Sequence, residues 1–349
     1  HMRFMRRVMP RLGGSNGQTP AARRSLNYRH AFHAGNFGDV MKHSILMTTI
    51  KHMQKKPNPM LLIDTHASTG LFDLRTPEAT RSPEFKQGIH RVEEYYKKFG
   101  SSELPEICRD YFYTVKSFSS LNEEQIQIYP GSPILIHNLM REDDRLVLSE
   151  LHPQEIAALH SNFVDLNCNK NVRFLEGDGY QIWTSFIPPL EKRGLVLCDP
   201  PYEKENEFKA VLKKIKQANI RWSTGTFFVW FPIKNPDFQA TWERELKQLG
   251  INKMLLCKLL VRDPTIDRQR LNGCGILILN PPYQLDQDLS DYMPWLAKLL
   301  GETPQAMGSC TWLTPDVFKP LRATSGGKKS SEKSNQIAGG GVAAGESAL

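Results

Sequence analysis

The chain lacks two features that would define its class at once. Its six cysteines are scattered singly over 349 residues, and no Cys-x-x-Cys pair occurs. This spacing argues against a zinc site and a disulfide framework, so we expect reduced thiols in a cytosol-like compartment. The chain also has no long apolar run. Its longest apolar segments have the length of strands, far short of the ~18 residues that a membrane-spanning helix needs.

The central part of the chain carries no net charge. The whole chain carries a net charge of +8, which taken alone is typical of a nucleic-acid-binding protein. Residues 1–24, however, hold six arginines and no acidic residue, and residues 320–349 hold four basic and two acidic residues. Residues 25–319 are therefore neutral overall. An RNA-binding surface has to be a local patch rather than a property of the whole domain.

The two ends of the chain differ in composition from the rest. Residues 1–24 are rich in arginine and predict a disordered basic leader, with an organelle transit segment as the alternative. Residues 320–349 are a low-complexity segment rich in Gly, Ser, Lys and Ala, which predicts a disordered tail. We expect residues 25–319 to form the folded domain, which is long enough to bury a large core.

The folded part alternates between strand-length apolar runs and helical stretches, which predicts an α/β fold with a mostly parallel sheet. Residues 71–129 break this alternation, because they hold charged helical stretches such as 89–99 and 107–121 and no expected strand. They predict a small helical subdomain inserted after the first strand. Seven strands are expected, at residues 60–64, 145–149, 172–176, 195–199, 226–231, 254–261 and 275–279.

The most informative motif follows the fourth expected strand, where the chain reads Asp199-Pro200-Pro201-Tyr202. The carboxylate and a carbonyl held by proline can accept hydrogen bonds from the exocyclic amine of a base, while the tyrosine ring stacks on that base. The natural electrophile for such an amine is the methyl group of S-adenosylmethionine. The motif therefore predicts Asp199, Pro200 and Tyr202 as catalytic residues, with an ordinary turn as the alternative for these four residues alone.

A second, similar run follows the last expected strand and reads Asn280-Pro281-Pro282-Tyr283. In a doubly wound sheet the ligand binds at the carboxyl ends of the central strands, where the strand order switches. The strand before Asp199 is expected beside the first strand, whereas Asn280 ends the last one. We therefore predict that Asp199 belongs to the catalytic turn and Asn280 to a structural turn.

The turn after the first expected strand spans residues 64–70 and includes His66, with Gly70 as its only glycine. In a nucleotide-binding βαβ unit this turn leads directly into a helix. Here the helix resumes only after the insertion, at Ser132, which we expect to be its N-cap with Pro133 at the first helical position. Alone, this turn needs no ligand.

The turns after the second and third expected strands carry acidic residues. Glu150 can accept hydrogen bonds from two ribose hydroxyls, or it can be a solvated acid in a loop. Asp178 precedes Gly179 and can accept from the adenine amine of a cofactor, although a tight turn is the alternative. Because these turns and the Asp199 turn follow successive strands at one edge of the sheet, together they predict a site for S-adenosylmethionine.

A polar cluster lies upstream, in residues 27–43, which hold three histidines. The apolar positions after it favour a helix packed in the core. Lys42 and His43 lie one turn into this helix and can point at the methionine carboxylate of the cofactor. A metal site is the alternative, but the segment has no helical His-x-x-x-His pair.

Taken in order, these motifs resemble the RlmJ family of large-subunit ribosomal RNA adenine-N6 methyltransferases. The resemblance covers about residues 25–317. It rests on Tyr28-Arg29-His30, His33-Ala34-Gly35-Asn36, Asp39-Val40, Lys42-His43, Asp64-Thr65-His66-Ala67, Tyr129-Pro130-Gly131-Ser132-Pro133, Glu150-Leu151-His152-Pro153, Asp178-Gly179 and Asp199-Pro200-Pro201-Tyr202.

The resemblance implies a Rossmann-like class I methyltransferase core with an inserted helical subdomain. It implies transfer of a methyl group from S-adenosylmethionine to N6 of a specific adenine in 23S ribosomal RNA, with Asp199 as the catalytic acceptor and Tyr28 in contact with the RNA. Ser68 departs from the family pattern, which has glycine there. The cofactor residues that the resemblance implies are His43, His66, Ser132, Glu150, Asp178 and Gly179.

Other activities stay open at this point. Methylation of guanine N2 uses similar turns, DNA adenine methylation uses the same amine, and a non-catalytic nucleic-acid-binding protein linked to the use of external DNA is a different class. We expect a cytoplasmic monomer that needs no metal and acts on 23S rRNA, either free or in a partly assembled large subunit. Further RNA contacts are expected from Arg29 and from the basic loop at residues 262–270.

Overall fold

The computed structural model describes residues 29–120, 123–168, 170–203 and 206–315. The predicted leader and tail and Tyr28 lie outside these residues. The central sheet has eight strands: β1 (Leu61–Asp64), β4 (Arg145–Glu150), β5 (Val172–Glu176), β6 (Gly194–Cys198), β7 (Thr226–Ile233), β8 (Met254–Leu260), β9 (Gly273–Leu279) and β10 (Met307–Thr314).

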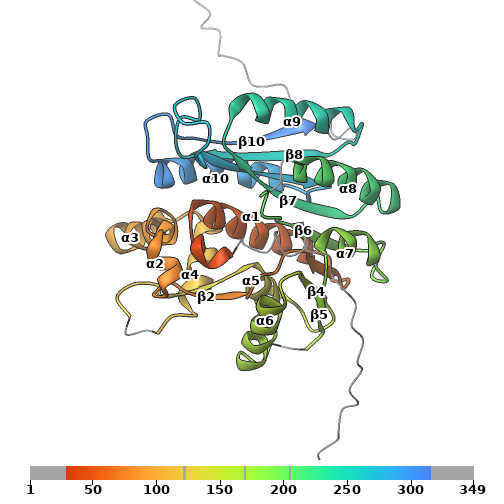
Figure 1. The fold of residues 1–349 in the computed structure, drawn as a ribbon, viewed down its shortest axis with the longest axis horizontal. Coiled ribbons are helices and arrows are strands. Elements are labelled where there is room, and N and C mark those ends of the chain that lie inside the picture. The colour runs from red at the N-terminus through yellow and green to blue at the C-terminus, as the bar shows by residue number, and fades with distance from the viewer. Residues whose placement is uncertain (1–28, 121–122, 169, 204–205, 316–349) are drawn as a thin grey trace, which may run out of the picture. The chain divides into compact units, whose positions relative to one another are not determined.

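The strand order is β10-β8-β9-β7-β6-β1-β4-β5 (Figure 1). The strands from β7 to β5 in this order run parallel to one another. From β1 the chain proceeds outward to β4 and β5, then returns to β6 on the other side of β1. This is a doubly wound sheet, so the predicted Rossmann-like α/β class is confirmed. The switch point lies between β1 and β6; Asp64 is the last residue of β1, and Asp199 is the first residue after β6.

The other half of the sheet is antiparallel, because β9 pairs in this sense with both β7 and β8, and β10 pairs with β8. The predicted number of seven strands was wrong, since β10 is an eighth. Its sequence mixes small and polar residues with few apolar ones, and only Leu313 is buried. An edge strand of this kind lacks the apolar run by which the other strands were recognised.

The inserted segment contains α2 (Pro77–Arg81), α3 (Ile89–Phe99) and α4 (Glu106–Lys116). The expected helix at residues 89–99 is confirmed, whereas the second ends five residues earlier than expected, at Lys116. The prediction that this segment holds no strand was wrong. β2 (Leu71–Asp73) pairs antiparallel with β3 (Ile128–Pro130), and strands of three residues are too short to produce a periodic pattern. In the part of the chain that the structure describes, three short 3₁₀ helices span His30–Phe32, Glu84–Gln87 and Ser101–Glu103.

Helices cover both faces of the sheet. One core packs against α1 (Phe37–Gln54), α5 (Ser132–Leu139), α6 (Pro153–Asp165) and α10 (Leu285–Leu300), and the other against α7 (Gly179–Ser185), α8 (Glu207–Arg221) and α9 (Pro236–Gln248). Strand residues enter the two cores alternately. In β6, Leu195 and Leu197 join the first core, and Val196 and Cys198 join the second.

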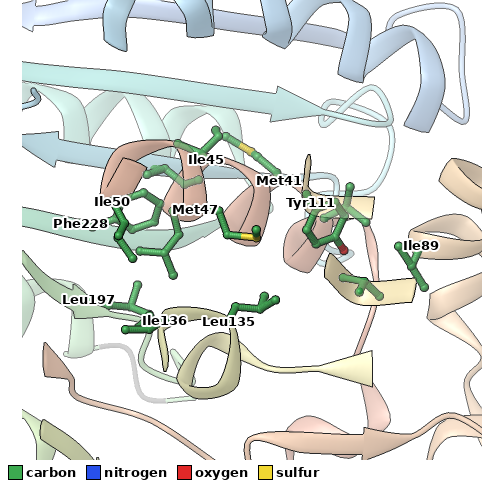
Figure 2. Packing of buried hydrophobic residues seen from close by; sticks show 14 of the residues in the cluster. Met41, Ile45, Met47, Ile50, Ile89, Tyr111, Leu135, Ile136, Leu197 and Phe228 are labelled. Carbon is green, nitrogen blue, oxygen red and sulfur yellow. The ribbon is translucent and has the colours of Figure 1, made fainter. Parts of the chain in front are cut away.

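Helix α1 is buried on nearly all sides. Figure 2 shows Met41, Ile45 and Met47 of this helix among side chains from the sheet and from the neighbouring helices. A helix enclosed in this way is held by packing on every side rather than by one apolar stripe. Its first turns therefore carry polar side chains into the core, next to the edge of the sheet at which β1 and β6 end.

The described residues contain no helix that is both long and apolar enough to cross a membrane. Within the same residues, no group of three or more His, Cys, Asp or Glu side chains is arranged to hold a metal ion. All six cysteines are free.

Candidate active site

A cavity of about 260 Å³ lies at the carboxyl ends of β1, β4, β5 and β6. We call it the acidic cavity, because several carboxylates line it. The four turns that strand order predicted at one edge of the sheet therefore meet around one cavity. All eight residues predicted to bind the cofactor line it: Lys42, His43, His66, Ser132, Glu150, Asp178, Gly179 and Asp199.

Asp199, the first residue after β6, is held by a buried lysine. Its Oδ2 accepts a hydrogen bond from Nζ of Lys42 at 2.5 Å, and the same ammonium lies 2.8 Å from Oδ1 of Asp39. Burial alone would lower the pKa of Lys42, but the two carboxylates raise it above its ordinary value. Lys42 was predicted to meet the methionine carboxylate of the cofactor. In the structure it lies between two carboxylates of the chain itself.

Asp39 is a site residue that the sequence reasoning missed. Its Oδ2 accepts hydrogen bonds from Nε2 of His30 and from the backbone N–H of Gly35, both at 2.9 Å. Burial alone would raise the pKa of Asp39, but His30 and Lys42 lower it well below its ordinary value. The sequence signal for Asp39 is its position one helical turn before Lys42, where an acidic side chain can pair with a lysine.

His43 is 1% exposed and presents an unpaired nitrogen. Its Nδ1 lies 2.7 Å from the hydroxyl of Tyr129. Burial lowers the pKa of His43 well below 6.5, so the ring is neutral near pH 7. Its Nε2 has no hydrogen-bond partner among the described residues, and Asp39, the nearest carboxylate, is 3.8 Å away. A buried polar atom that lacks a hydrogen-bond partner is one to which a bound ligand commonly supplies that partner.

Ser132 supports the turn after β1. Its hydroxyl donates to Oδ2 of Asp64 at 2.7 Å, and burial raises the pKa of Asp64 to about 6. Ser132 is the first residue of α5, and Gly131 is the N-cap. The predicted cap was therefore wrong by one residue, because the serine side chain is engaged by Asp64 rather than by the N–H groups of the helix.

His66 follows in the same turn as a neutral ring, since burial lowers its pKa to about 4. The hydroxyl of Thr65 donates to the carbonyl of Leu197 at 3.0 Å and lies 2.8 Å from Nδ1 of His66. Because the hydroxyl proton is used on Leu197, Nδ1 must carry the proton in this contact. Nε2 of His66 is then a hydrogen-bond acceptor.

Glu150 is fixed at the end of β4. One oxygen accepts from the backbone N–H of Ser68 at 2.8 Å and the other from that of His152 at 2.9 Å. Burial raises the pKa of Glu150, although these two hydrogen bonds oppose the rise. Ser68 has a φ of +50°, a conformation that favours glycine, which agrees with the glycine expected at this position.

Asp178 and Gly179 bring the turn after β5 against the turn after β1. Oδ1 of Asp178 accepts from the backbone N–H of Tyr180 at 2.9 Å and so caps α7. A Cβ atom added to Gly179 would lie 2.0 Å from the carbonyl oxygen of Thr65. Only glycine permits this approach of two backbones.

Residues of the turn at 199–202 line two different cavities. Asp199 and Pro201 line the acidic cavity, whereas Tyr202 lines a second one with Phe208. The Tyr202 hydroxyl donates to the carbonyl of Trp230 at 2.8 Å, and Pro200 is buried and lines neither cavity. The predicted stacking of Tyr202 on a base stays a prediction.

Asn280 lies at the opposite edge of the sheet from Asp199. Strand β9 runs antiparallel to β7 and pairs Leu279 with Phe227, so it ends where β7 begins. The Nδ2 group of Asn280 donates to the carbonyls of Ser223 and Gly225 at 2.7 and 2.8 Å. With a φ of +49°, Asn280 is a turn residue whose side chain fastens the backbone.

Three arginines predicted to contact RNA, Arg29, Arg262 and Arg268, each have a partner within the chain. Arg29 is exposed and donates to Gln154 at 3.2 Å. In the basic loop, both nitrogens of Arg262 that face Glu302 lie 2.6 Å from its carboxylate, so this arginine has a structural partner. Arg268 is exposed and lies 2.5 Å from Asp237. RNA contacts of Arg29 and Arg268 stay predictions.

Comparison with known proteins identifies relatives over most of the chain. The family model described as "Ribosomal RNA large subunit methyltransferase D, RlmJ" matches residues 57–314. Proteins named "Ribosomal RNA large subunit methyltransferase J" from Escherichia coli K12 and Haemophilus influenzae are 34% and 35% identical to this chain, over 83% of it and 100% of their own lengths. A crystal structure of a protein from Legionella pneumophila matches with a TM-score of 0.71 and 30% identity, over 80% of this chain and 98% of that one.

Proposed function

The chain belongs to the RlmJ family of ribosomal RNA large subunit methyltransferases, and on this basis we propose that it transfers a methyl group from S-adenosylmethionine to N6 of an adenine in 23S ribosomal RNA. The observation that carries the proposal is the position of Asp199 on the acidic cavity, beside the turns of β1, β4 and β5. Asp199, which can accept an amine, and the residues that can hold a nucleoside therefore line the same cavity.

The acidic cavity suits S-adenosylmethionine, which when bound supplies an electrophilic methyl group on a positively charged sulfur. Glu150, fixed by two backbone N–H groups, has lone pairs left to accept from ribose hydroxyls. Asp178 accepts from the adenine amine of the cofactor. The unpaired Nε2 of His43 and the acceptor nitrogen of His66 offer further polar contacts. The surrounding carboxylates favour the cationic cofactor electrostatically.

Asp199 accepts a hydrogen bond from the N6 amine of the target adenine, and we propose the carbonyl of Pro200 as a second acceptor, although Pro200 lines neither cavity in this structure. The lone pair of this amine is delocalised into the ring, so these acceptors favour the pyramidal nitrogen that attack requires. Lys42 fixes the orientation of the Asp199 carboxylate and acts as a positioning residue. Most of the acceleration then comes from holding the two reacting atoms together.

The target adenine has to leave its stack to reach Asp199, which costs a few kcal/mol and favours an unpaired site in the RNA. We assign the methyltransferase domain to residues 25–319, and we propose that the inserted segment at 71–129, Arg29 and Arg268 each contribute contacts to the RNA. The neutral charge of residues 25–319 favours recognition of RNA shape over tight non-specific binding. We propose a monomer that acts in the cytoplasm, where large subunits assemble.

The proposal is tested by incubating the protein with methyl-labelled S-adenosylmethionine and three acceptors: protein-free large-subunit RNA, intact large subunits and duplex DNA. The product is digested, and the modified nucleoside is identified by mass spectrometry. We expect N6-methyladenosine in ribosomal RNA. N2-methylguanosine, or label only in DNA, would contradict the proposal. The preferred RNA acceptor shows whether the substrate is free RNA or a particle.

A further inference from the structure

A second cavity of about 290 Å³ opens beside the catalytic turn and is not used in the proposed reaction. We call it the aromatic cavity. Its lining includes Tyr202, which follows Asp199 in the same turn, and residues from α8, β7, α9 and the loop that contains Arg268. All of its lining residues belong to the described part of the chain.

The aromatic side chains of this cavity form a connected cluster around Phe208. The ring centroid of Phe208 lies 4.5 Å from that of Tyr202, 4.6 Å from that of Phe238 and 5.1 Å from that of Trp242. Phe238 is nevertheless 45% exposed, which is high for a phenylalanine. An open cavity walled by aromatic rings matches the flat face of a nucleobase, because every base can stack on such rings.

Two of the lining residues also carry polar atoms without partners. Oε1 of Gln239 and Nε1 of Trp242 are buried and have no hydrogen-bond partner in the described part of the chain. One is an acceptor and the other a donor. The edge of a base offers both kinds of group, so a bound base is one way to complete these two hydrogen bonds after small side-chain adjustments.

Positive charge lies at the rim of the cavity. Lys234 and Arg268 both line it and are exposed. Arg268 pairs with Asp237, but their side chains are 50% and 75% exposed, and exposed pairs of this kind contribute little to stability. Arg268 can therefore exchange this partner for a phosphate group of bound RNA.

We propose that the aromatic cavity holds a nucleobase of the substrate RNA that neighbours the target adenine in sequence. The inference rests on the proposed function. The target base is a less suitable occupant, because its amine has to reach Asp199, which lines the acidic cavity and not this one. The cofactor is excluded for the same reason, since its predicted residues all line the acidic cavity. The turn at residues 199–202 contributes Asp199 and Pro201 to the acidic cavity and Tyr202 to the aromatic cavity, so nucleotides adjacent in the RNA can occupy the two cavities together.

The test uses a short RNA that contains the methylated adenine, once the position of that adenine has been mapped, and a set of copies with a single abasic nucleotide at each flanking position. Methyl transfer by the wild type is compared with transfer by Phe238→Ala and by Ile220→Ala. Ile220 is a matched control, because it is 75% exposed on α8 and lines none of the cavities described here. The affinity for S-adenosylmethionine is measured for each protein.

We expect Phe238→Ala to lower kcat/KM for the intact RNA by roughly tenfold, the effect of losing one base–aromatic stack, with cofactor affinity and folding unchanged. One abasic RNA should lower the wild-type rate by a similar factor and show no further loss with Phe238→Ala. Ile220→Ala should behave as wild type. The inference is overturned if Phe238→Ala methylates the intact RNA as well as wild type, or if no flanking abasic position cancels its effect.

Cross-linking of the wild-type protein gives a second readout that needs no variant. Copies of the RNA with 4-thiouridine at single flanking positions are irradiated, and the attached peptides are identified by mass spectrometry. Attachment to peptides of the aromatic cavity supports the inference, and attachment only elsewhere overturns it. Failure of the proposed function itself would look different, because the wild type would then transfer no methyl group to the intact RNA.

Discussion

Replacing Lys42 by methionine removes one positive charge from the core while keeping a side chain of similar length. The Lys42 ammonium lies 2.5 Å from Asp199 and 2.8 Å from Asp39, and its side chain is 4% exposed. Without it, two carboxylates remain close together with less compensation. We expect both the free energy of unfolding and the rate of methyl transfer to fall, the latter because Asp199 loses the group that orients it.

The magnitude follows from the burial of the three side chains. Removing one partner of a buried ion pair costs about 3–5 kcal/mol. Asp199 is 16% exposed and Asp39 keeps its hydrogen bonds to His30 and Gly35, so the lower end, about 3 kcal/mol, is expected here. Lys51→Met is the matched control on the same helix. Lys51 pairs with Asp110 where both side chains are exposed, by 42% and 35%, and should lose less than about 1 kcal/mol.

The pH dependence of the free energy of unfolding distinguishes the loss of these ion pairs from a simple packing defect. The raised pKa of Lys42 means that its stabilising contribution is complete at neutral pH and is lost only at alkaline pH. The lowered pKa of Asp39 means that its contribution is lost only as the pH falls through that low value. Without Lys42 the pKa of Asp39 rises, so Asp39 is protonated at a higher pH in the variant. The stability difference between wild type and variant should therefore shrink on acidification.

Urea denaturation near neutral pH and again at about pH 4 measures these differences. A loss for Lys42→Met no larger than that for Lys51→Met would refute the reasoning. So would a difference that is the same at both pH values, because a simple packing defect does not titrate.

Two further variants test the residues that are predicted to bind the cofactor. Gly179→Ala should weaken binding of S-adenosylmethionine by roughly tenfold or more in calorimetry, because its Cβ would lie 2.0 Å from the carbonyl of Thr65 and push two turns apart; unchanged affinity would count against the proposed site. Affinity of the wild type should also fall as the pH drops toward the raised pKa of Glu150, since the protonated acid is a poorer acceptor for ribose hydroxyls. Glu150→Gln should bind weakly and lose part of this pH dependence, and an unaltered profile would exclude Glu150 from the ribose contact.

The sequence could predict at which edge of the sheet the site lies, because the motifs that indicate this edge are short and local. Each turn follows a buried strand with a clear apolar run, and parallel strands bring their carboxyl ends to one edge. Asp178 and Asp199 were found in this way. The preference for Asp199 over Asn280 depended on strand order alone, and the antiparallel direction of β9 now places Asn280 at the opposite edge.

The features that were missed depend on contacts between distant segments. The contact between Lys42 and Asp199 spans 157 positions in the chain, and no local pattern indicates it. The reason for glycine at position 179 is likewise a backbone from another turn. The aromatic cavity combines residues from two helices, a strand and three loops, and no local pattern in the sequence shows that these segments meet.

The central claim, that Asp199 holds the amine that is methylated, is tested most directly by comparing Asp199→Ala with Asn280→Ala. Methyl transfer to large-subunit RNA is measured per folded molecule, because Asn280→Ala also removes two hydrogen bonds from a turn at positive φ and should lower stability. We predict that Asp199→Ala abolishes formation of N6-methyladenosine and that folded Asn280→Ala retains it. Retained activity in folded Asp199→Ala, or loss only in Asn280→Ala, would contradict the account.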